Sequence, residues 1–210
     1  MIWHALSKMK EAGIRQVMIV TGSESAGLFA RLIGSGSALG LNVTFRIQDE
    51  AGGIAQALGL ASEFVGENEK FVALLADNLF EASLAPYLSR FQSQREGALL
   101  LLKEVPDPFR YGVPELDGDR IVRIEEKPER PKSPFCVTGI YFYDGGVFRI
   151  AESLTPSRRG ELEITDVNNV YAERGLLRYE VLPGWWTDAG TFESLHEAGS
   201  RLIGIGGDPR

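Results

Sequence analysis

Apolar residues in this chain occur in two patterns, which alternate from beginning to end. Short apolar runs, such as 98–103, are typical of buried strands, whereas residues 1–12 show apolar positions at the spacing of an amphipathic helix. Strand and helix patterns follow one another repeatedly, which predicts an α/β fold with a mostly parallel sheet covered by helices. We expect helices at 1–12, 26–33, 54–64, 84–94, 147–154, 166–174 and 192–202, and strands at 16–20, 41–47, 70–75, 98–103, 137–143 and 177–182.

A hairpin and a short tail complete the expected organisation. Residues 111–126 contain alternating apolar positions on both sides of Asp117-Gly118-Asp119, which predicts a β-hairpin turned at that glycine. No repeat, low-complexity tract or long linker divides the chain. We therefore expect one domain over residues 1–203 and a flexible, glycine-rich tail over 204–210.

Composition and charge narrow the possible functions. The 210 residues are 44% hydrophobic and 24% charged, with a formal net charge of −7. This acidity disfavours nonspecific binding to nucleic acid or to a membrane surface, although local cations can still bind a phosphorylated small molecule. Cys136 is the only cysteine, and neither an apolar run of membrane-spanning length nor a signal-peptide layout is present. We expect a cytoplasmic protein with no nucleic-acid or membrane partner.

Two aspartates that are distant in sequence each follow an apolar run, and they are the first candidate chemistry. Asp77 follows the run 72–76, and Asp188 follows 182–187. Ligands of open α/β sheets bind beyond the carboxyl ends of the strands, and two carboxylates meeting there would suit Mg²⁺ held against a phosphate. Alternatively, Asp77 caps a turn, and Asp188 precedes a last helix whose N-cap is Thr191.

A glycine pair between an expected strand and an expected helix is the second candidate. Gly52 and Gly53 allow close approach of a ligand to the backbone. The side chain of Gln48 offers one hydrogen-bond donor and one acceptor, which can pair with the edge of a pyrimidine. A plain βα turn that requires glycine explains the same pattern.

Charged residues at two further places could bind a sugar phosphate. Pro128 ends a strand, so Glu126 and Lys127 lie where the chain leaves the sheet; a carboxylate accepts sugar hydroxyls and a lysine neutralises phosphate. Arg158 and Arg159 could bind phosphate through two hydrogen bonds, and Thr165 or Asp166 could cap the helix that follows. A solvated strand end and a surface loop are the simpler alternatives.

Taken together, these segments resemble the sugar nucleotidyltransferase family, over residue 1 to about residue 198. The resemblance depends on the combination of motifs in order along the chain rather than on any one of them. The matching segments are 48–56, 77–78, 110–113, 126–128, 137–141, 159–165 and 186–191.

The resemblance implies a fold and an activity. It implies a Rossmann-like, open, mostly parallel mixed sheet flanked by helices, and Mg²⁺-dependent transfer of a thymidylyl group from dTTP, or of the corresponding group from UTP, to glucose 1-phosphate with release of pyrophosphate. The family tends to form homo-oligomers. By the resemblance, Asp77 and Asp188 hold the metal; Gln48 and Gly53 read the base; Asn78, Gly112, Glu126 and Val137 contact the sugar; Lys127 and Arg159 bind the sugar phosphate; and Tyr141 and Trp186 shape the pocket wall.

This chemistry requires positioning and charge neutralisation more than a general base. The sugar phosphate is itself the nucleophile and is already ionised at neutral pH. We therefore expect structural roles for the two histidines, His4 and His196.

One family segment does not occur in the 210 residues. The family opens with a strand and a loop of the form G-G-x-G-T-R-L-x-P that wraps the triphosphate, and Met1 corresponds to the helix after it. The expected sheet therefore lacks its first strand, which leaves two neighbouring strands with an unpaired edge, and we expect little transferase activity from these residues alone. Three explanations of the missing segment are open. The chain is a fragment or has a mis-assigned start, it is a degraded relative that still binds sugar nucleotide, or another segment or subunit fills the gap.

Two other functions are alternatives to the transferase. The first is a binding module that uses the same pocket without turnover. The second is a metal-dependent glycosyltransferase. Such enzymes usually hold their metal through an Asp-x-Asp motif, and this hypothesis is weaker because Leu79 stands where the second aspartate of a motif beginning at Asp77 would be.

Overall fold

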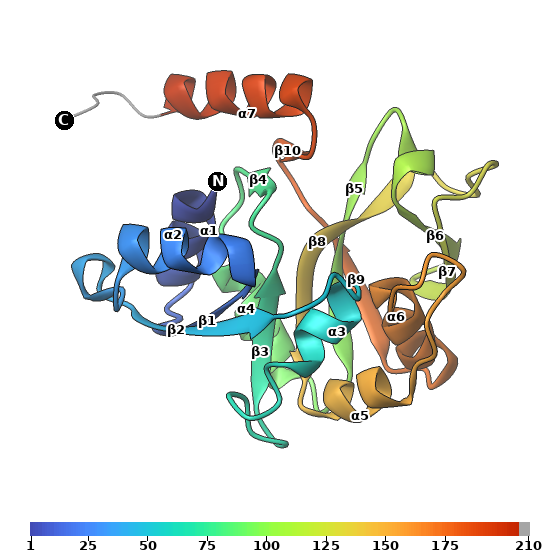
Figure 1. The fold of residues 1–210 in the computed structure, drawn as a ribbon. Coiled ribbons are helices and arrows are strands. Elements are labelled where there is room, and N and C mark those ends of the chain that lie inside the picture. The colour runs from blue at the N-terminus through green and yellow to red at the C-terminus, as the bar shows by residue number, and fades with distance from the viewer. Residues whose placement is uncertain (206–210) are drawn as a thin grey trace.

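A four-stranded mixed sheet forms the centre of the computed structural model, which describes residues 1–205 (Figure 1). Its strands lie in the order β3 (Lys70–Leu74), β8 (Phe135–Asp144), β5 (Ala98–Glu104), β9 (Leu177–Val181). β8 pairs antiparallel with β3 and β5, whereas β5 and β9 are parallel. The α/β class is confirmed, and the parallel character is confined to some of the ladders.

A second, two-stranded sheet lies beside the first. β1 (Gln16–Gly22) and β2 (Asn42–Gln48) pair in parallel, from Gln16 opposite Asn42 to Gly22 opposite Gln48. The helix α2 (Ser23–Ile33) connects them, as the βαβ pattern requires. Within residues 1–205, β1 pairs only with β2 and β3 only with β8, so each has an edge without a partner strand. This matches the unpaired edges expected of a sheet without its first strand.

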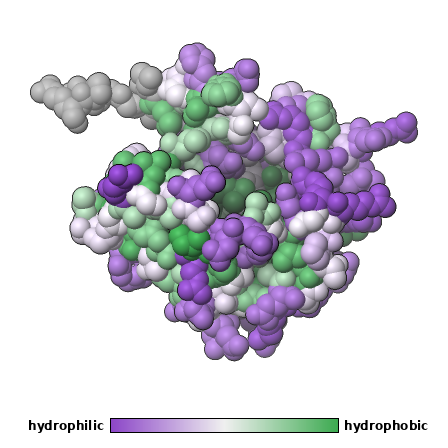
Figure 2. Space-filling view, viewed as in Figure 1, coloured by the Kyte–Doolittle hydropathy of each residue, from purple (hydrophilic) through white to green (hydrophobic). Residues whose placement is uncertain are grey.

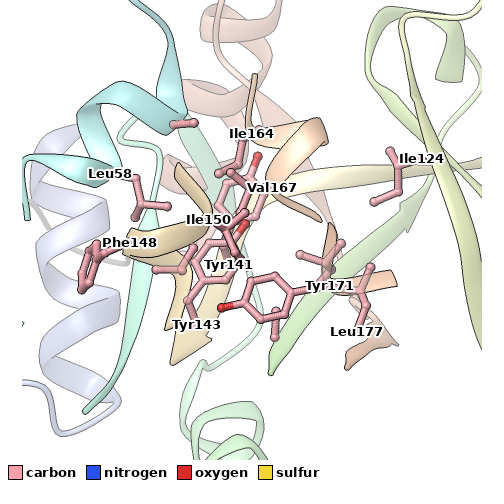
Figure 3. Close-up of a cluster of buried hydrophobic side chains, with 14 of the residues drawn as sticks. Leu58, Ile124, Tyr141, Tyr143, Phe148, Ile150, Ile164, Val167, Tyr171 and Leu177 are labelled. Carbon is pink, nitrogen blue, oxygen red and sulfur yellow. The ribbon is translucent and has the colours of Figure 1, made fainter. Parts of the chain in front are cut away.

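The side chains of β8 divide the core between the two faces of the central sheet. Tyr141 and Tyr143 point to one face, where they join the apolar cluster shown in Figure 3. Phe142, between them, points to the other face and packs with Phe80 and Phe91. This alternation arises because successive side chains of a strand face opposite sides. The first cluster is covered by α3 (Ile54–Gly59), α5 (Gly146–Ser153) and α6 (Ile164–Glu173), and the second by α1 (Ile2–Glu11) and α4 (Ala85–Ser93).

The remaining elements position the candidate site. The predicted hairpin is present as β6 (Gly112–Asp117) and β7 (Arg120–Glu126), and it turns at Gly118. Two short strands, β4 (Asn78–Phe80) and β10 (Trp186–Asp188), form an antiparallel pair that the hydrophobic pattern did not predict because each is only three residues long. Two 3₁₀ turns, Ser37–Leu39 and Pro108–Arg110, complete the list of elements.

Several expected boundaries need correction. α3 ends at Gly59 rather than at residue 64, and α6 begins at Ile164 with Glu163 at the N-cap position, so Thr165 lies in the first turn and does not cap the helix. α7 (Phe192–Ile205) continues through residues 204 and 205, which the expected tail included; residues 206–210 of that tail lie outside the described part. No helix of the described chain combines the length and the apolar character needed to cross a bilayer.

Candidate functional site

The pairing of β4 with β10 brings together the two aspartates that are distant in sequence. Asp188 lies opposite Asn78 in this ladder, and the amide of Ala189 donates to the carbonyl oxygen of Asp77 at 2.9 Å. Asp77 ends the loop after β3, and Asp188 is the last residue of β10. Both carboxylates are thus carried by one two-stranded unit at one end of the central sheet.

The pKa of Asp188 reflects charged groups from three other segments of the chain, those of Asp77, Arg110 and Lys127. Burial raises the pKa of this carboxyl, and the negative charge of Asp77 raises it further. The amide of Gly190, which donates to Asp188 Oδ1 at 2.8 Å, and the cations Arg110 and Lys127 act in the opposite direction. The site therefore holds two mutually repelling carboxylates with cations on its border.

Asn78 is the buried connection between these groups. It is 2% exposed, and its Oδ1 accepts hydrogen bonds from the Gly139 amide and from Trp186 Nε1, both at 2.8 Å. Its Nδ2 donates to Asp77 Oδ1 at 3.0 Å. A Cβ on Gly139 would lie only 2.5 Å from Asn78 Nδ2, so β8 needs glycine where this amide packs against it. The Oδ1 of Asn78 is saturated by protein contacts, whereas one of the two N–H groups of its Nδ2 has no partner among the described residues.

The chain is strained at Lys127. Its φ of 46° is the only positive φ of a non-glycine residue among the described residues, and Pro128 follows, which disfavours this conformation further. The Lys127 amide donates to the carbonyl oxygen of Tyr111 at 3.0 Å, and the ring of Tyr111 meets that of Trp186 edge to face, 5.6 Å between centroids. Strain of this kind persists where surrounding contacts impose it, often at functional sites. Lys127 is exposed and makes no ion pair in the described structure.

Glu126 and Arg159 belong to one polar network. Thr165 Oγ1 donates to Glu126 Oε2 at 2.6 Å, and Arg159 lies 3.8 Å from the other oxygen. Arg159 also binds Glu163 at 2.8 Å and lies 3.7 Å from Glu161. Burial alone would raise the pKa of Glu163, but hydrogen bonds from Arg159 and Ser157 outweigh burial and lower it. The guanidinium predicted to bind phosphate is thus held by three carboxylates.

The glycine turn predicted to read a base is also held by a network of hydrogen bonds. Gln48 Nε2 donates to the carbonyl oxygen of Gly53 at 3.2 Å and to Gln56 Oε1 at 2.6 Å. The same Gln56 oxygen accepts from the Gly52 amide at 3.1 Å. Gln48 and Gly53 are therefore in direct contact, although the turn alone places them five residues apart.

Three further predicted residues lie on the strands between these groups. Val137 and Tyr141 are on the same face of β8 as Gly139. Tyr141 is 4% exposed and stacks on Tyr143 at 5.9 Å, so its ring is a core residue. Burial raises the pKa of Tyr141, and the charges of Glu126 and Asp77 add to this, which places its hydroxyl near both. Gly112 lies opposite Glu126 in the hairpin.

Three residues of this neighbourhood had no role assigned from the sequence: Arg110, Tyr111 and Glu163. Burial raises the pKa of Tyr111 to about 12, so the phenol stays protonated at neutral pH. Arg110 and Tyr111 were visible as members of the segment 110–113, but their contacts depend on how the hairpin folds back onto β10. Glu163 was visible in the same way, as a member of the segment 159–165, but its role depends on its contact with Arg159.

The donors present suit a hard cation. No group of three or more His, Cys, Asp or Glu residues in the described structure could form a complete metal site. Two carboxylates with the remaining ligands supplied by water and phosphate oxygens are typical of Mg²⁺ rather than of zinc. The soft or nitrogen ligands nearby are unsuitable: Cys136 is buried with its pKa raised to about 12 by burial, and His4 Nε2 accepts from the Phe80 amide at 3.2 Å.

The surface agrees with a site at this end of the sheet. Figure 2 shows a face hollowed near its centre, below α7, with hydrophobic residues on the floor of the hollow. A separate hollow of about 180 Å³ lies on the β6–β7 hairpin, where Val113, Glu125 and Lys132 are among its lining residues. None of the predicted site residues lines that second hollow.

The fold and the arrangement of this site are those of a nucleotidyl transferase. Residues 1–203 match the nucleotidyl transferase family, and the chain belongs to it. A glucose-1-phosphate thymidylyltransferase of Neisseria meningitidis is 43% identical over 204 residues, which are 95% of this chain and 70% of the relative. One from Mycolicibacterium smegmatis is 42% identical, over 94% of this chain and 69% of its own length.

Solved structures agree with these relatives. A crystal structure of a Bacillus anthracis protein described as a glucose-1-phosphate thymidylyltransferase, in complex with sucrose, is 49% identical to this chain. It superposes with a TM-score of 0.93 over 99% of this chain and 84% of its own. A UDP-glucose pyrophosphorylase in complex with UDP-glucose, 23% identical, shares the fold with a TM-score of 0.84 over 98% of this chain and 87% of its own.

Proposed function

We propose that this site binds a thymidine nucleotide and glucose 1-phosphate and that the family reaction it serves is formation of dTDP-glucose and pyrophosphate. The observation that supports this most is the pairing of β4 with β10, because it joins Asp77 and Asp188 beside Lys127. The thymidylyltransferases that resemble the chain over 94–95% of its length support the choice of substrates.

In this proposal each group of residues has one task. Asp77 and Asp188 would hold Mg²⁺, which supplies neutralisation of the phosphate charge that develops during transfer. Lys127 and Arg159 bind the phosphate of the sugar, and Glu126 accepts from sugar hydroxyls. Gln48 and Gly53 bind the base. The sugar phosphate attacks as an oxyanion, so no side chain has to remove a proton.

A second candidate is a sugar-nucleotide-binding module. It would use the same pocket to bind a nucleotide sugar without turnover. Uracil in place of thymine is an outcome of the same experiments, since one methyl group contributes only about 1–3 kcal/mol to discrimination. We also propose a cytoplasmic homo-oligomer, which size-exclusion chromatography with light scattering would test.

Calorimetry and a turnover assay together test the proposal. We expect dTDP-glucose to bind in the presence of MgCl₂ and the Asp77→Asn variant to lose the metal-dependent part of that binding. Pyrophosphate release from dTTP and glucose 1-phosphate would support the transferase, and binding without release would select the module. If the protein binds neither dTDP-glucose nor dTTP and glucose 1-phosphate, both candidate functions are contradicted.

A further inference from the structure

Two loops that belong to different halves of the candidate site are joined by main-chain hydrogen bonds. The amide of Leu162 donates to the carbonyl oxygen of Gly52 at 2.8 Å, and the amide of Ala55 donates to the carbonyl oxygen of Leu162 at 3.1 Å. We call these two bonds the Gly52–Leu162 pairing. It connects the turn that contains Gly53 with the loop that contains Arg159, more than a hundred residues later in the sequence.

The pairing depends on glycine at position 53. Gly53 has a φ of +97°, which only glycine adopts readily. A Cβ there would lie 2.5 Å from the carbonyl oxygen and 2.9 Å from the nitrogen of Leu162. Leu162 can approach this closely only because residue 53 has no side chain. This requirement for glycine is separate from the approach of a ligand.

The opposite side of the turn is fixed by two glutamines, so that the turn is held on both sides. Gln56 accepts from the Gly52 amide, and Gln48 donates to the Gly53 carbonyl oxygen. After these bonds the amide of Gly53 has no partner among the described residues, and the Oε1 of Gln48 accepts from none of them. One main-chain donor of the turn and one acceptor of Gln48 thus remain without a partner in the described structure, and together they match a base edge that has an acceptor next to an N–H.

We propose that Leu162, through its main chain, is a positioning residue that fixes the Gly53 turn and thereby sets the preference for one base over another. The inference rests on the proposed function, in which Gln48 and Gly53 bind the base. Leu162 itself touches no part of the nucleotide. Its side chain packs against the main apolar cluster, so Leu162 connects the turn to the core on one side as Ala55 of α3 does on the other.

The test removes the Leu162 amide and measures base preference. In Leu162→Pro the N–H is absent, and Arg158→Pro is the matched control in the same loop. Arg158 is the second residue of a turn in which the Gly160 amide donates to the Ser157 carbonyl oxygen at 2.9 Å, a position that accepts proline. Calorimetry with dTDP and with dCDP gives the preference, because thymine has an N3–H and cytosine does not.

We expect the wild-type chain and Arg158→Pro to prefer dTDP by on the order of tenfold or more, as for one base edge read by two hydrogen bonds, and Leu162→Pro to lose most of that preference. A general loss of structure would weaken both nucleotides alike and leave the ratio unchanged. If Leu162→Pro does not fold, replacing the Leu162 amide by a backbone ester removes the same N–H without a proline ring.

The possible results separate this inference from the proposed function. Retained preference in the Leu162 variant overturns the positioning role and leaves the proposed function intact. Loss of preference in Arg158→Pro as well overturns it too, since any proline in the loop would then suffice. A wild-type chain that binds neither nucleotide, or both equally, contradicts base reading by Gln48 and Gly53 and with it both proposals.

Discussion

Replacing Asn78 tests how the metal-binding end of the site is assembled. Asn78→Ala removes the acceptor of two hydrogen bonds of 2.8 Å, from the Gly139 amide and from Trp186 Nε1. Gly139 lies in the buried strand β8, where water cannot replace the lost acceptor. At about 1–2 kcal/mol for each donor left without a partner, the free energy of unfolding should fall by about 2–4 kcal/mol.

Asn78→Asp separates the donor role of this side chain from its acceptor role. A carboxylate keeps both accepted bonds but replaces the N–H group that donates to Asp77 Oδ1 at 3.0 Å with a second negative charge. That charge raises the folded-state pKa of the carboxyls above the unfolded value of about 3.9. The destabilisation is therefore full at pH 7 and disappears as the pH falls below the unfolded value. Mg²⁺ should also reduce it, because the new carboxylate adds a ligand.

Urea denaturation followed by circular dichroism gives the free energy of unfolding of both variants. The experiment compares unfolding at pH 7 with unfolding at pH 4. At pH 7 it also compares unfolding without MgCl₂ with unfolding at MgCl₂ concentrations raised in 10-fold steps. We expect relief by acid and by Mg²⁺ for Asn78→Asp and by neither for Asn78→Ala. An alanine variant within about 0.5 kcal/mol of the wild type would refute the role of Asn78 as a buried acceptor. An aspartate variant insensitive to pH would refute the proximity of the carboxylates.

Three further predictions concern single side chains. The free energy of unfolding should be about 1 kcal/mol higher for Lys127→Gly than for Lys127→Ala, because glycine accepts a φ of 46°. Calorimetry should show that both variants bind glucose 1-phosphate equally weakly. Asp188→Asn should raise the melting temperature at pH 7 without metal, since burial and Asp77 disfavour that charge, and should abolish the rise that MgCl₂ causes in the wild type. Burial, with a smaller effect of Lys8, lowers the pKa of His4 to about 4, below the value of 6.5 in the unfolded chain. The free energy of unfolding should therefore fall by about 1–2 kcal/mol between pH 7 and pH 4, after allowance for the partial exposure of His4. His4→Gln, measured in parallel, should lack that part of the loss. Equal slopes for His4→Gln and wild type would contradict the last of these.

The strands and helices that bury an apolar run could be predicted from the sequence, and those that exist only through pairing could not. Residues 98–103 are apolar at every position but the last, so β5 was expected almost at its observed bounds. β4 and β10 have three residues each and no periodicity of their own. Their existence depends on the loop after β3 meeting the chain before α7, which is tertiary information.

The same distinction applies to the site. Asp77 and Asp188 could be selected because a carboxylate at the end of an apolar run is unusual, and Glu126 with Lys127 because proline ends their strand. Leu162 could not be selected, since its contribution comes from main-chain atoms that every residue possesses. Gly53 was attributed to the approach of a ligand, and the structure adds a second reason for glycine there, its close contact with Leu162.

The charges of the site indicate an order in which ligands bind. Arg159 is already held by Glu163, Glu161 and Glu126, so a phosphate can bind it only in competition with these carboxylates. Lys127 has no such partner in the described structure, its backbone is strained, and its charge lowers the pKa of Asp188, so it lies within electrostatic reach of that carboxylate. Two carboxylates beside it would repel a phosphate until a divalent cation neutralises them. We therefore expect the affinity for glucose 1-phosphate to rise with Mg²⁺ concentration and to depend more on Lys127 than on Arg159. Calorimetry that shows equal affinity with Mg²⁺ and with EDTA would exclude this order.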